Sequence, residues 1–199
     1  MAKINAVTER QKEIIDAARR IIGSRGMGEL TIRELAKEIN LTEGALYRHF
    51  KSKKEIISLL IDDIENSLLT TIEEALNKGQ DPLSSLHEIL FHHISYAEQR
   101  KGLTFLLINE VMGLKNAHLQ KKMYSVIEQY LKKIRGVLAG GVESRVFRKN
   151  MDVALASLAF FGLVQSLVTF WSLSDFKFSI TKARIEELFA IYKEGVVRK

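Results

Sequence analysis

The sequence contains no cysteine and only one proline among its 199 residues. Without cysteine, the chain cannot form disulfides or use thiolate chemistry, although this does not fix its compartment. One proline, no evident hairpin dipeptide and little alternation with a period of two all disfavour β-strands. We therefore predict an all-α fold of about nine helices.

Motifs of enzymes and of targeting segments are also missing. The sequence has no Gly-rich phosphate loop, and no His–Asp pair accompanies a nucleophile motif, so we expect neither an enzyme nor a bound cofactor. Residues 1–7 are too short for a signal peptide and lack its apolar core. We expect them to form a loose arm of a cytoplasmic protein.

Residues 31–55, TIRELAKEINLTEGALYRHFKSKKE, are the most informative part of the chain. Thr31 and Glu34 form a T-x-x-E capping box that starts a helix, and Asn40 is a plausible left-handed stop. Thr42 can then cap a second, very short helix. Two short helices joined by a turn of a few residues can place the second helix in a DNA major groove.

The second of these helices has a surface suited to DNA. Gly44 and Ala45 let the backbone approach a base edge closely, and basic or polar side chains follow at its C-terminal side. The segment resembles the DNA-binding domain of the TetR/AcrR family of transcriptional regulators over roughly residues 8–57. The matching positions are Thr31, Arg33, Leu35, Ala36, Gly44, Leu46, Tyr47, His49, Phe50, Lys51, Ser52, Lys53 and Ile56.

This resemblance implies a set of DNA contacts. Arg33, Glu43, Gly44 and Ala45 occupy positions where the family reads bases, and Tyr47 and Lys53 occupy phosphate-contact positions. The complete set expected at the DNA is Arg33, Thr42, Glu43, Gly44, Ala45, Tyr47, His49, Lys51 and Lys53. Residues 1–55 also hold twelve Lys and Arg against eight Asp and Glu, a net charge of +4 that favours phosphate contact.

Two domains are expected, a three-helix helix-turn-helix domain over residues 1–52 and a helical dimerisation and effector domain over residues 53–199. Thr8 and Gln11 form a weaker capping box at the first helix, and Ser52 and Glu55 form another at the fourth. Further helices are predicted over about 53–77, 82–99, 103–114, 116–139, 149–172 and 181–196. Asp81 and Pro82 should start the second of these, and Gly140-Gly141 should end the helix over 116–139.

Residues 153–174 carry no charge, so by length alone they could span a membrane. Several Ser and Thr residues and one Gln make the segment only modestly hydrophobic, and a helix that is apolar all round must be buried. The resemblance implies that the protein's own core covers one side and a second subunit covers the other. We expect Ala159, Gly162, Ser166 and Phe170 at this dimer interface. A membrane-associated helical protein is the alternative from a different class.

Aromatic residues and Met are spread over the helices that, by resemblance, surround the family's effector cavity. Such a cavity would be apolar and would suit acyl chains or hydrophobic drugs; the alternative is that these side chains simply pack together. The expected lining is Phe91, Phe105, Asn109, Met112, Phe161 and Gln165. Glu88 and His92 share a helix face and could seed a metal site, but no second ligand pair follows, so we expect no metal.

The prediction is a homodimeric regulator that binds a palindromic DNA operator and is released, as a repressor, by a small apolar effector. The resemblance implies that the effector tilts the helix over 53–77 and changes the separation of the two recognition helices. The stretches ALYRHF, DDIENSLLTTIEE and RKGLTFLL also resemble the nucleoid-occlusion branch, SlmA-like proteins that bind DNA and restrain the division protein FtsZ. A DNA-bound regulator of cell division is therefore the alternative function.

Overall fold

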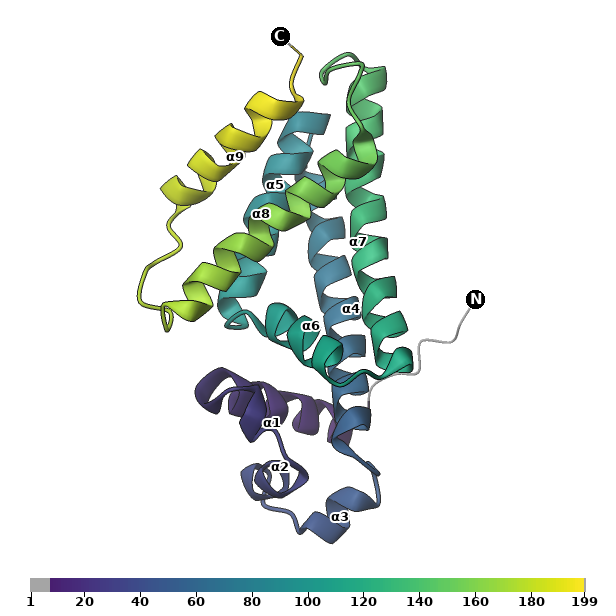
Figure 1. The fold of residues 1–199 in the computed structure, drawn as a ribbon, viewed down its shortest axis with the longest axis vertical. Helices are drawn as coiled ribbons and strands as arrows, with labels where there is room; N and C mark the ends of the chain where they lie inside the picture. Colours follow the sequence, from purple (N-terminus) through teal and green to yellow (C-terminus); the bar gives the residue numbers. More distant parts are fainter. Residues whose placement is uncertain (1–7, 199) are drawn as a thin grey trace.

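The computed structural model describes residues 8–198, and all the helices in this range belong to one all-α fold (Figure 1). The arm expected over residues 1–7 lies outside the described residues. The helices are α1 (Glu9–Arg25), α2 (Ile32–Glu38), α3 (Glu43–Tyr47), α4 (Lys53–Lys78), α5 (Pro82–Gln99), α6 (Leu103–Gly113), α7 (Ala117–Glu143), α8 (Val153–Leu173) and α9 (Lys182–Val196). A 3-10 turn, Met27–Glu29, follows α1.

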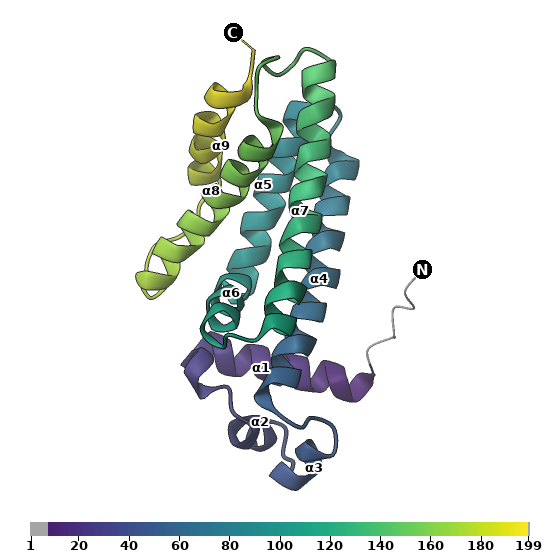
Figure 2. The same ribbon diagram turned by 45° about the vertical axis from the view of Figure 1, so that its right-hand side comes forward.

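Helices α1–α3 form a small unit at one end of the molecule, and α4, α5 and α7 run along its length (Figures 1 and 2). Helix α4 packs against α5 and α7 and also contacts α1, so it belongs to both parts of the molecule. Helices α8 and α9 lie along one side of the bundle (Figure 2). The α4 side chains buried along this path form one apolar stripe, namely Ile56, Ile57, Leu60, Ile61, Ile64, Leu68, Ile72 and Ala75.

Several helix starts follow the sequence closely. The Thr8 hydroxyl accepts the Gln11 N–H at 3.2 Å while the Gln11 side chain accepts the Thr8 N–H at 2.9 Å, which confirms that capping box. The Asp81 carboxylate accepts two N–H groups at the start of α5, where Pro82 is the first helical residue. Such caps satisfy donors that have no partner inside the helix.

Three local predictions were wrong. Ser52 makes no side-chain cap at the start of α4, because Glu55 turns back and accepts the Lys51 N–H at 2.9 Å instead. Helix α7 continues through Gly140 and Gly141 to Glu143. A side chain at position 141 would overlap the Phe147 ring, so this glycine serves packing and does not stop the helix.

The third wrong prediction concerns the start of α8. This helix begins at Val153, four residues later than predicted, where Asp152 accepts the N–H groups of Ala154 and Leu155.

Helix α8 exposes most of its apolar side chains. By length and composition alone it could cross a membrane, and only 22% of its most apolar stretch is buried within the protomer. The exposed large side chains on it are Leu155 (64%), Leu158 (52%), Phe170 (72%) and Leu173 (78%), and Ile191 of α9 is 69% exposed. This apolar surface, called the α8–α9 face below, is left uncovered by the part of the protomer that the structure describes.

Candidate DNA-binding interface and domain junction

The connection between α2 and α3 is a tight turn with the geometry of a helix-turn-helix. Asn40 adopts a left-handed φ of 52°, as its sequence position predicted, and the Leu41 N–H then donates to the Ala36 carbonyl at 2.8 Å. The Thr42 hydroxyl accepts the Ala45 N–H at 3.1 Å and starts α3. These local bonds fix the direction of a helix that is itself only 5 residues long.

Helix α3 buries one side and exposes the other. Leu46 and Phe50 are buried in the core of the small unit, which leaves the polar side of α3 to the solvent. The exposed members of the predicted DNA set are Arg33, Thr42, Glu43, Gly44, Tyr47, His49 and Lys51, and Ala45 is half-buried. The structure therefore brings eight of the nine predicted residues to one end of the molecule, available to a duplex.

Lys53, the ninth residue, is paired within the protomer. It is half-buried, and its ammonium lies 3.0 Å from the Glu110 carboxylate of α6 and 3.4 Å from the Met27 carbonyl. Arg48, which the sequence analysis left out of the set, is exposed on the same segment as Tyr47 and His49. The available indication was a guanidinium directly after the second helix of such a motif, where it can reach a phosphate.

Ion pairs stiffen the small unit behind this surface. Arg25 donates to Glu34 at 2.6 Å, and Arg20 donates to Glu38 at 2.9 Å. Because Glu34 is engaged by Arg25, only the Thr31 half of the predicted capping box is seen, with the Glu34 N–H donating to the Thr31 hydroxyl at 3.1 Å. Helix α1 is thereby tied to α2.

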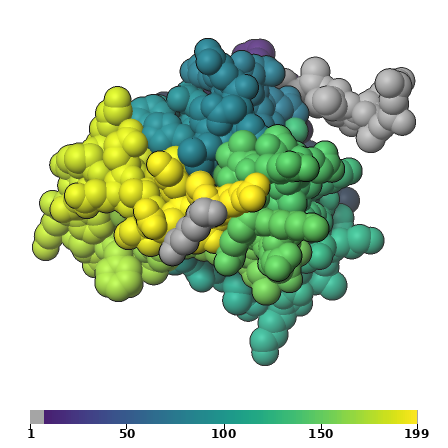
Figure 3. Space-filling view, turned by 90° about the horizontal axis from the view of Figure 1, so that it is seen from above, coloured from purple at the N-terminus to yellow at the C-terminus, as the bar shows by residue number. Residues whose placement is uncertain are grey.

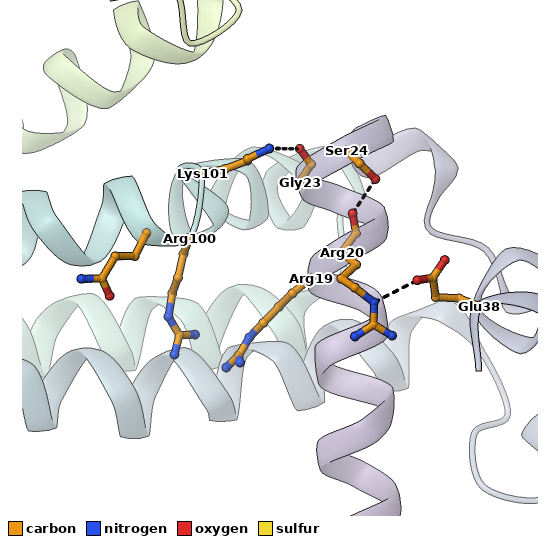
Figure 4. Close-up of a pocket in the computed structure, with 8 residues that line it drawn as sticks. Arg19, Arg20, Gly23, Ser24, Glu38, Arg100 and Lys101 are labelled. Carbon is orange, nitrogen blue, oxygen red and sulfur yellow. Dashed lines mark hydrogen bonds and ion pairs between the residues drawn. The ribbon is translucent and has the colours of Figure 1, made fainter. Parts of the chain in front are cut away.

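A hollow of about 650 Å³ lies where α1 meets the α5–α6 turn (Figure 4). Its lining side chains include four cations, Arg19, Arg20, Arg100 and Lys101, and one carboxylate, Glu38. Lys101 reaches across to the Gly23 carbonyl at 3.4 Å, and this contact joins α1 to the turn (Figure 4). The hollow is called the junction hollow below.

Asp63 of α4 holds this junction together. Its carboxylate accepts both the Arg19 guanidinium of α1 and, at 2.9 Å, that of Arg100. One carboxylate therefore pairs with two guanidinium groups. The Arg19 Nε is buried without a hydrogen-bond partner among the described residues. Sequence analysis missed these residues, although Arg19-Arg20 and Arg100-Lys101 are adjacent cation pairs near the ends of two helices.

Arg100 also lies over the Tyr96 ring, 4.6 Å from its centroid, and the Tyr96 hydroxyl is 2.9 Å from the Ser67 hydroxyl. Burial is the main cause that raises the pKa of Tyr96, so its hydroxyl stays protonated at neutral pH. The junction is therefore a polar network that links α1, α4 and α5.

The predicted effector residues differ in their exposure. Phe161 is half-buried beside Tyr130, with ring centroids 5.5 Å apart. Asn109 and Met112 are exposed, because α6 turns its other side, with Leu107 and Val111, towards the core. The remaining three, Phe91, Phe105 and Gln165, are half-buried.

Inside the bundle, His93 and Tyr130 form a fully buried polar pair, with the His93 Nδ1 3.0 Å from the Tyr130 hydroxyl. Burial lowers the pKa of His93 to about 4 and raises the pKa of Tyr130, so both groups are neutral at neutral pH. This pair is a polar contact within reach of Phe161, which stacks on the His93 ring.

Glu88 and His92, which could have seeded a metal site, lie beside a lysine instead. His92 lies 3.6 Å from Glu88, but the Lys78 ammonium is 3.1 Å from the same His92 nitrogen. Within residues 8–198 no three His, Cys, Asp or Glu side chains come together in a way that could hold a metal. A cation at this distance opposes a second cation.

The four residues predicted at the dimer interface, Ala159, Gly162, Ser166 and Phe170, are all exposed on α8. They contribute to the α8–α9 face described above. A side chain at Gly162 would meet no atom of its own protomer within 4 Å, so this position opens directly to the exterior.

Comparisons with known proteins agree with this arrangement. The profile described as "Bacterial regulatory proteins, tetR family" matches residues 14–60, and that of "YsiA-like protein, C-terminal region" matches residues 62–193. Together these matches span nearly all of the described chain. The protein belongs to the TetR family.

Members of the TetR family among the relatives differ in their roles. Nucleoid occlusion factor SlmA of Vibrio campbellii is 28% identical over 189 residues, with 92% of this chain and 94% of the relative covered. The fatty acid metabolism regulator protein of Bacillus subtilis is 26% identical over 168 residues, with 84% and 86% covered. The protein is therefore a DNA-binding transcriptional regulator and not an enzyme.

Solved structures share the TetR family fold. The regulator FadR of Bacillus subtilis, in complex with stearoyl-CoA, has a TM-score of 0.80 at 24% identity, with 92% of this chain and 98% of that chain covered. The ketosteroid regulator KstR2 of Mycobacterium tuberculosis has a TM-score of 0.77 at 21% identity, with 97% of both chains covered. The all-α prediction is confirmed. Regulators of this family are typically dimeric and cytoplasmic.

Proposed function

We propose that this protein is a cytoplasmic homodimeric repressor that binds a palindromic operator and is released by an acyl-chain effector. The observation that carries the proposal is that one protomer exposes two surfaces of different chemistry. The polar side of α3 lies at one end of the molecule, and the uncovered α8–α9 face lies along its side.

A second copy is the natural partner for the α8–α9 face. Soluble monomers rarely expose an apolar patch of more than a few hundred Å². Pairing of two such faces would also present two copies of α3. A palindromic operator requires these helices to be about 34–36 Å apart.

An effector with an apolar chain and an anionic end suits the second part of the molecule. The junction hollow offers Arg19, Arg100 and Lys101 to the anionic end, and the aromatic interior of the bundle offers an environment for the chain. A relative controls fatty acid metabolism, and a protein with the same fold binds stearoyl-CoA. Anion binding would compete with Asp63 for Arg19 and Arg100, and so would loosen the contact of α1 with α4.

The effector test is a series of acyl-CoA ligands of graded chain length, scored by thermal shift and by release of the operator found in a genome-wide binding footprint. We expect affinity to rise by about 0.8 kcal/mol per buried CH₂ until the site is full. Arg100→Gln should weaken acyl-CoA binding, whereas Arg135→Gln, which removes a guanidinium from the outer part of α7, should not. No dependence on chain length in either assay would mean that the aromatic residues are simply packed together.

The DNA test separates base reading from phosphate contact. Arg33→Ala should cost roughly 1–3 kcal/mol of operator affinity and relax selection at one base position. Lys51→Ala should weaken binding to all sequences and reduce the salt slope by about 0.9. We expect the same of Lys53→Ala, provided that Lys53 leaves Glu110 for a phosphate on DNA. A change of base preference with an unchanged salt slope would contradict the phosphate assignments.

A DNA-bound regulator of cell division is the second candidate, and it is favoured by the 28% identity to SlmA over nearly the whole chain. Co-sedimentation with FtsZ filaments and division arrest on overexpression test it directly. Under the repressor proposal, neither should occur, and genes for lipid metabolism or efflux should lie beside the operator.

A further inference from the structure

The arginine side chains of residues 8–198 fall into two groups. Seven of them make an ion pair, a hydrogen bond or a ring contact within the protomer: Arg10, Arg19, Arg20, Arg25, Arg100, Arg135 and Arg184. The others have no such side-chain partner among the described residues: Arg33, Arg48, Arg145, Arg148 and Arg198. Arg33 and Arg48 belong to the surface that faces DNA.

The three remaining arginines gather at the opposite end of the molecule. They belong to the segment between α7 and α8 and to the C-terminal tail, which meet far from α3 (Figure 1). Seen from that end, the tail lies beside the segment that follows α7 (Figure 3). The guanidinium groups without a partner among residues 8–198 are thus concentrated at two ends, and DNA binding accounts for only one of them.

The backbone at this second end is well defined. The Arg148 N–H donates to the Val196 carbonyl at 3.0 Å, and the Arg198 N–H donates to the Val146 carbonyl at 3.2 Å. These bonds form an antiparallel bridge between Phe147 and Val197. The bridge holds the two segments side by side, so the cations on them lie close together. The bridged segments are called the support below.

A buried aromatic ring anchors the support. Phe147 is 1% exposed and packs on Gly141, where a side chain would overlap the ring. The N–H groups of Val146 and Phe147 both donate to the Gly141 carbonyl at 2.9 Å. Arg145 has a left-handed φ of 62°, which L-residues adopt only when their surroundings require it. The turn is therefore fixed by its core contacts, and its cations are placed by that geometry.

A hollow of about 650 Å³ lies within this support, and Arg145, Arg148, Lys149 and Arg198 line it. Val142 contributes apolar surface, and among residues 8–198 Glu143 is the only carboxylate in the lining, so the formal charge of its four cations and one anion is +3. The volume is in the range of small-molecule sites. Guanidinium groups bind phosphate oxygens through pairs of hydrogen bonds.

We propose that this hollow binds a small organic polyphosphate, a molecule with two or more phosphate groups on a partly apolar body. Two phosphates are needed to balance a formal charge of +3. The cations surround a concavity and do not follow a stripe along the surface, so they suit a compact anion better than a duplex. A second copy is a poor occupant, since it would have to desolvate four cations against a single carboxylate.

The test is calorimetric titration of the full-length protein with ATP, CoA, inorganic triphosphate, inorganic phosphate and adenosine, at about 50 mM salt so that screening stays weak. We expect the organic polyphosphates to bind, inorganic phosphate to bind more weakly, and adenosine not to bind. The order of ATP and CoA distinguishes a nucleoside triphosphate from a coenzyme pyrophosphate as the source. The variant Arg148→Ala/Arg198→Ala should lose about tenfold or more in affinity for ATP, because two charge-assisted contacts are removed. The same loss for CoA is measured in the Arg100→Gln background, because the junction hollow is proposed to hold the anionic end of an acyl-CoA.

Two further double variants locate the effect. Lys177→Ala/Lys182→Ala removes the same charge from the exposed surface around the start of α9, and Arg33→Ala/Arg48→Ala removes it from the end of the molecule that carries α3. Both variants should retain wild-type affinity for ATP and CoA. All of the substituted side chains are exposed, so each variant should unfold at the wild-type temperature. The proposal is overturned if the wild type binds none of the polyphosphates, if Arg148→Ala/Arg198→Ala binds them unchanged, or if Arg33→Ala/Arg48→Ala abolishes binding.

Discussion

The α1–α3 unit and the α4–α9 bundle are both helical, but they expose surfaces of different chemistry. In the small unit, α2 and α3 are short helices whose caps and turn lie within a few residues of one another, and α3 exposes a polar side. The bundle builds long helices and exposes an apolar side on α8 and α9. A polar exposed side suits a hydrated, charged duplex, whereas an apolar one suits another protein surface.

The difference also concerns how far apart in sequence the interacting residues are. Thr42 caps α3 through Ala45, three residues away. In the bundle, His93 pairs with Tyr130, 37 residues away, and at the junction Asp63 pairs with Arg19 of α1, 44 residues away. The contacts that start α3 are therefore local, whereas those in the bundle core and at the junction arise only when the chain has folded.

The largest effect is expected where the bundle meets a second copy. Gly162→Glu places a charge on the α8–α9 face, where its own protomer leaves open space. In a dimer, that charge would be buried without a partner at a cost of about 3–5 kcal/mol, enough to dissociate the dimer and abolish operator binding. Light scattering and operator titration measure both results.

Gly136→Glu is the matched control, because Gly136 on α7 is also exposed and free of neighbours within 4 Å. This variant should remain dimeric and bind the operator. If Gly162→Glu also remains a dimer, or if the wild type is a monomer, then the α8–α9 face is not the interface.

A smaller effect is expected from the buried pair in the bundle core. Burial lowers the pKa of His93 from 6.5 to about 4, so the unfolded chain binds a proton between these values and the folded protein does not. The contribution to the free energy of unfolding is complete above pH 6.5 and is lost as pH falls towards 4, by about 3 kcal/mol in total. Urea unfolding between about pH 7 and pH 5 should show the decline.

His93→Gln should flatten this part of the pH dependence, although it should also lower stability at neutral pH by weakening the contact with Tyr130. His118→Gln, at an exposed position on α7, should leave the pH dependence unchanged. An identical decline in the wild type and in His93→Gln would assign the proton uptake to other groups.

The smallest effect compares two ion pairs that differ in burial. The side chains of Asp63, Arg19 and Arg100 are 17%, 26% and 21% exposed, whereas the side chain of Glu73, which pairs with Lys133 at 2.7 Å, is 61% exposed. Asp63→Asn leaves two guanidinium groups without their carboxylate and should lower the free energy of unfolding by about 2 kcal/mol. Glu73→Gln should lower it by less than about 1 kcal/mol.

Equal losses in the two variants would mean that the junction carries no more energy than a surface pair. A second measurement separates stability from coupling. Because Asp63 joins α1 to α4 and α5, Asp63→Asn should also change operator affinity at a temperature where the variant is fully folded, and Glu73→Gln should not.

The sequence was most informative where a short polar residue faced a nearby backbone group. Asn40 and Thr42 adopted their predicted roles because each is determined by neighbours within a few residues. Ser52 failed in the same kind of role, since Glu55 found a different donor, and this competition is not visible from spacing. Gly141 does not end α7; its lack of a side chain makes room for the Phe147 ring. The sequence could not show this, because Phe147 reaches Gly141 only after α7 has ended and the chain has turned back.

Site prediction follows the same division. The predicted DNA-binding set could be proposed from one segment, and all nine of its members are at least partly accessible. The ion pair of Lys53 could not be predicted in the same way, because Glu110 comes from α6, 57 residues later in the chain. The junction residues and the His93–Tyr130 pair were not predicted as sites, because no local pattern brings Asp63 to Arg19 or Tyr130 to His93.

Helix α4 has one further consequence, which concerns leverage. It contains 26 residues without glycine or proline, so it is a stiff rod of roughly 39 Å at about 1.5 Å per residue. If such a rod pivots at one end, each degree of tilt moves the other end by about 0.7 Å. A rotation of three to four degrees beside α5 and α7 would therefore displace α3 by about 2–3 Å. Small repacking within the bundle is enough to move the DNA-reading end by a distance comparable to the length of a hydrogen bond.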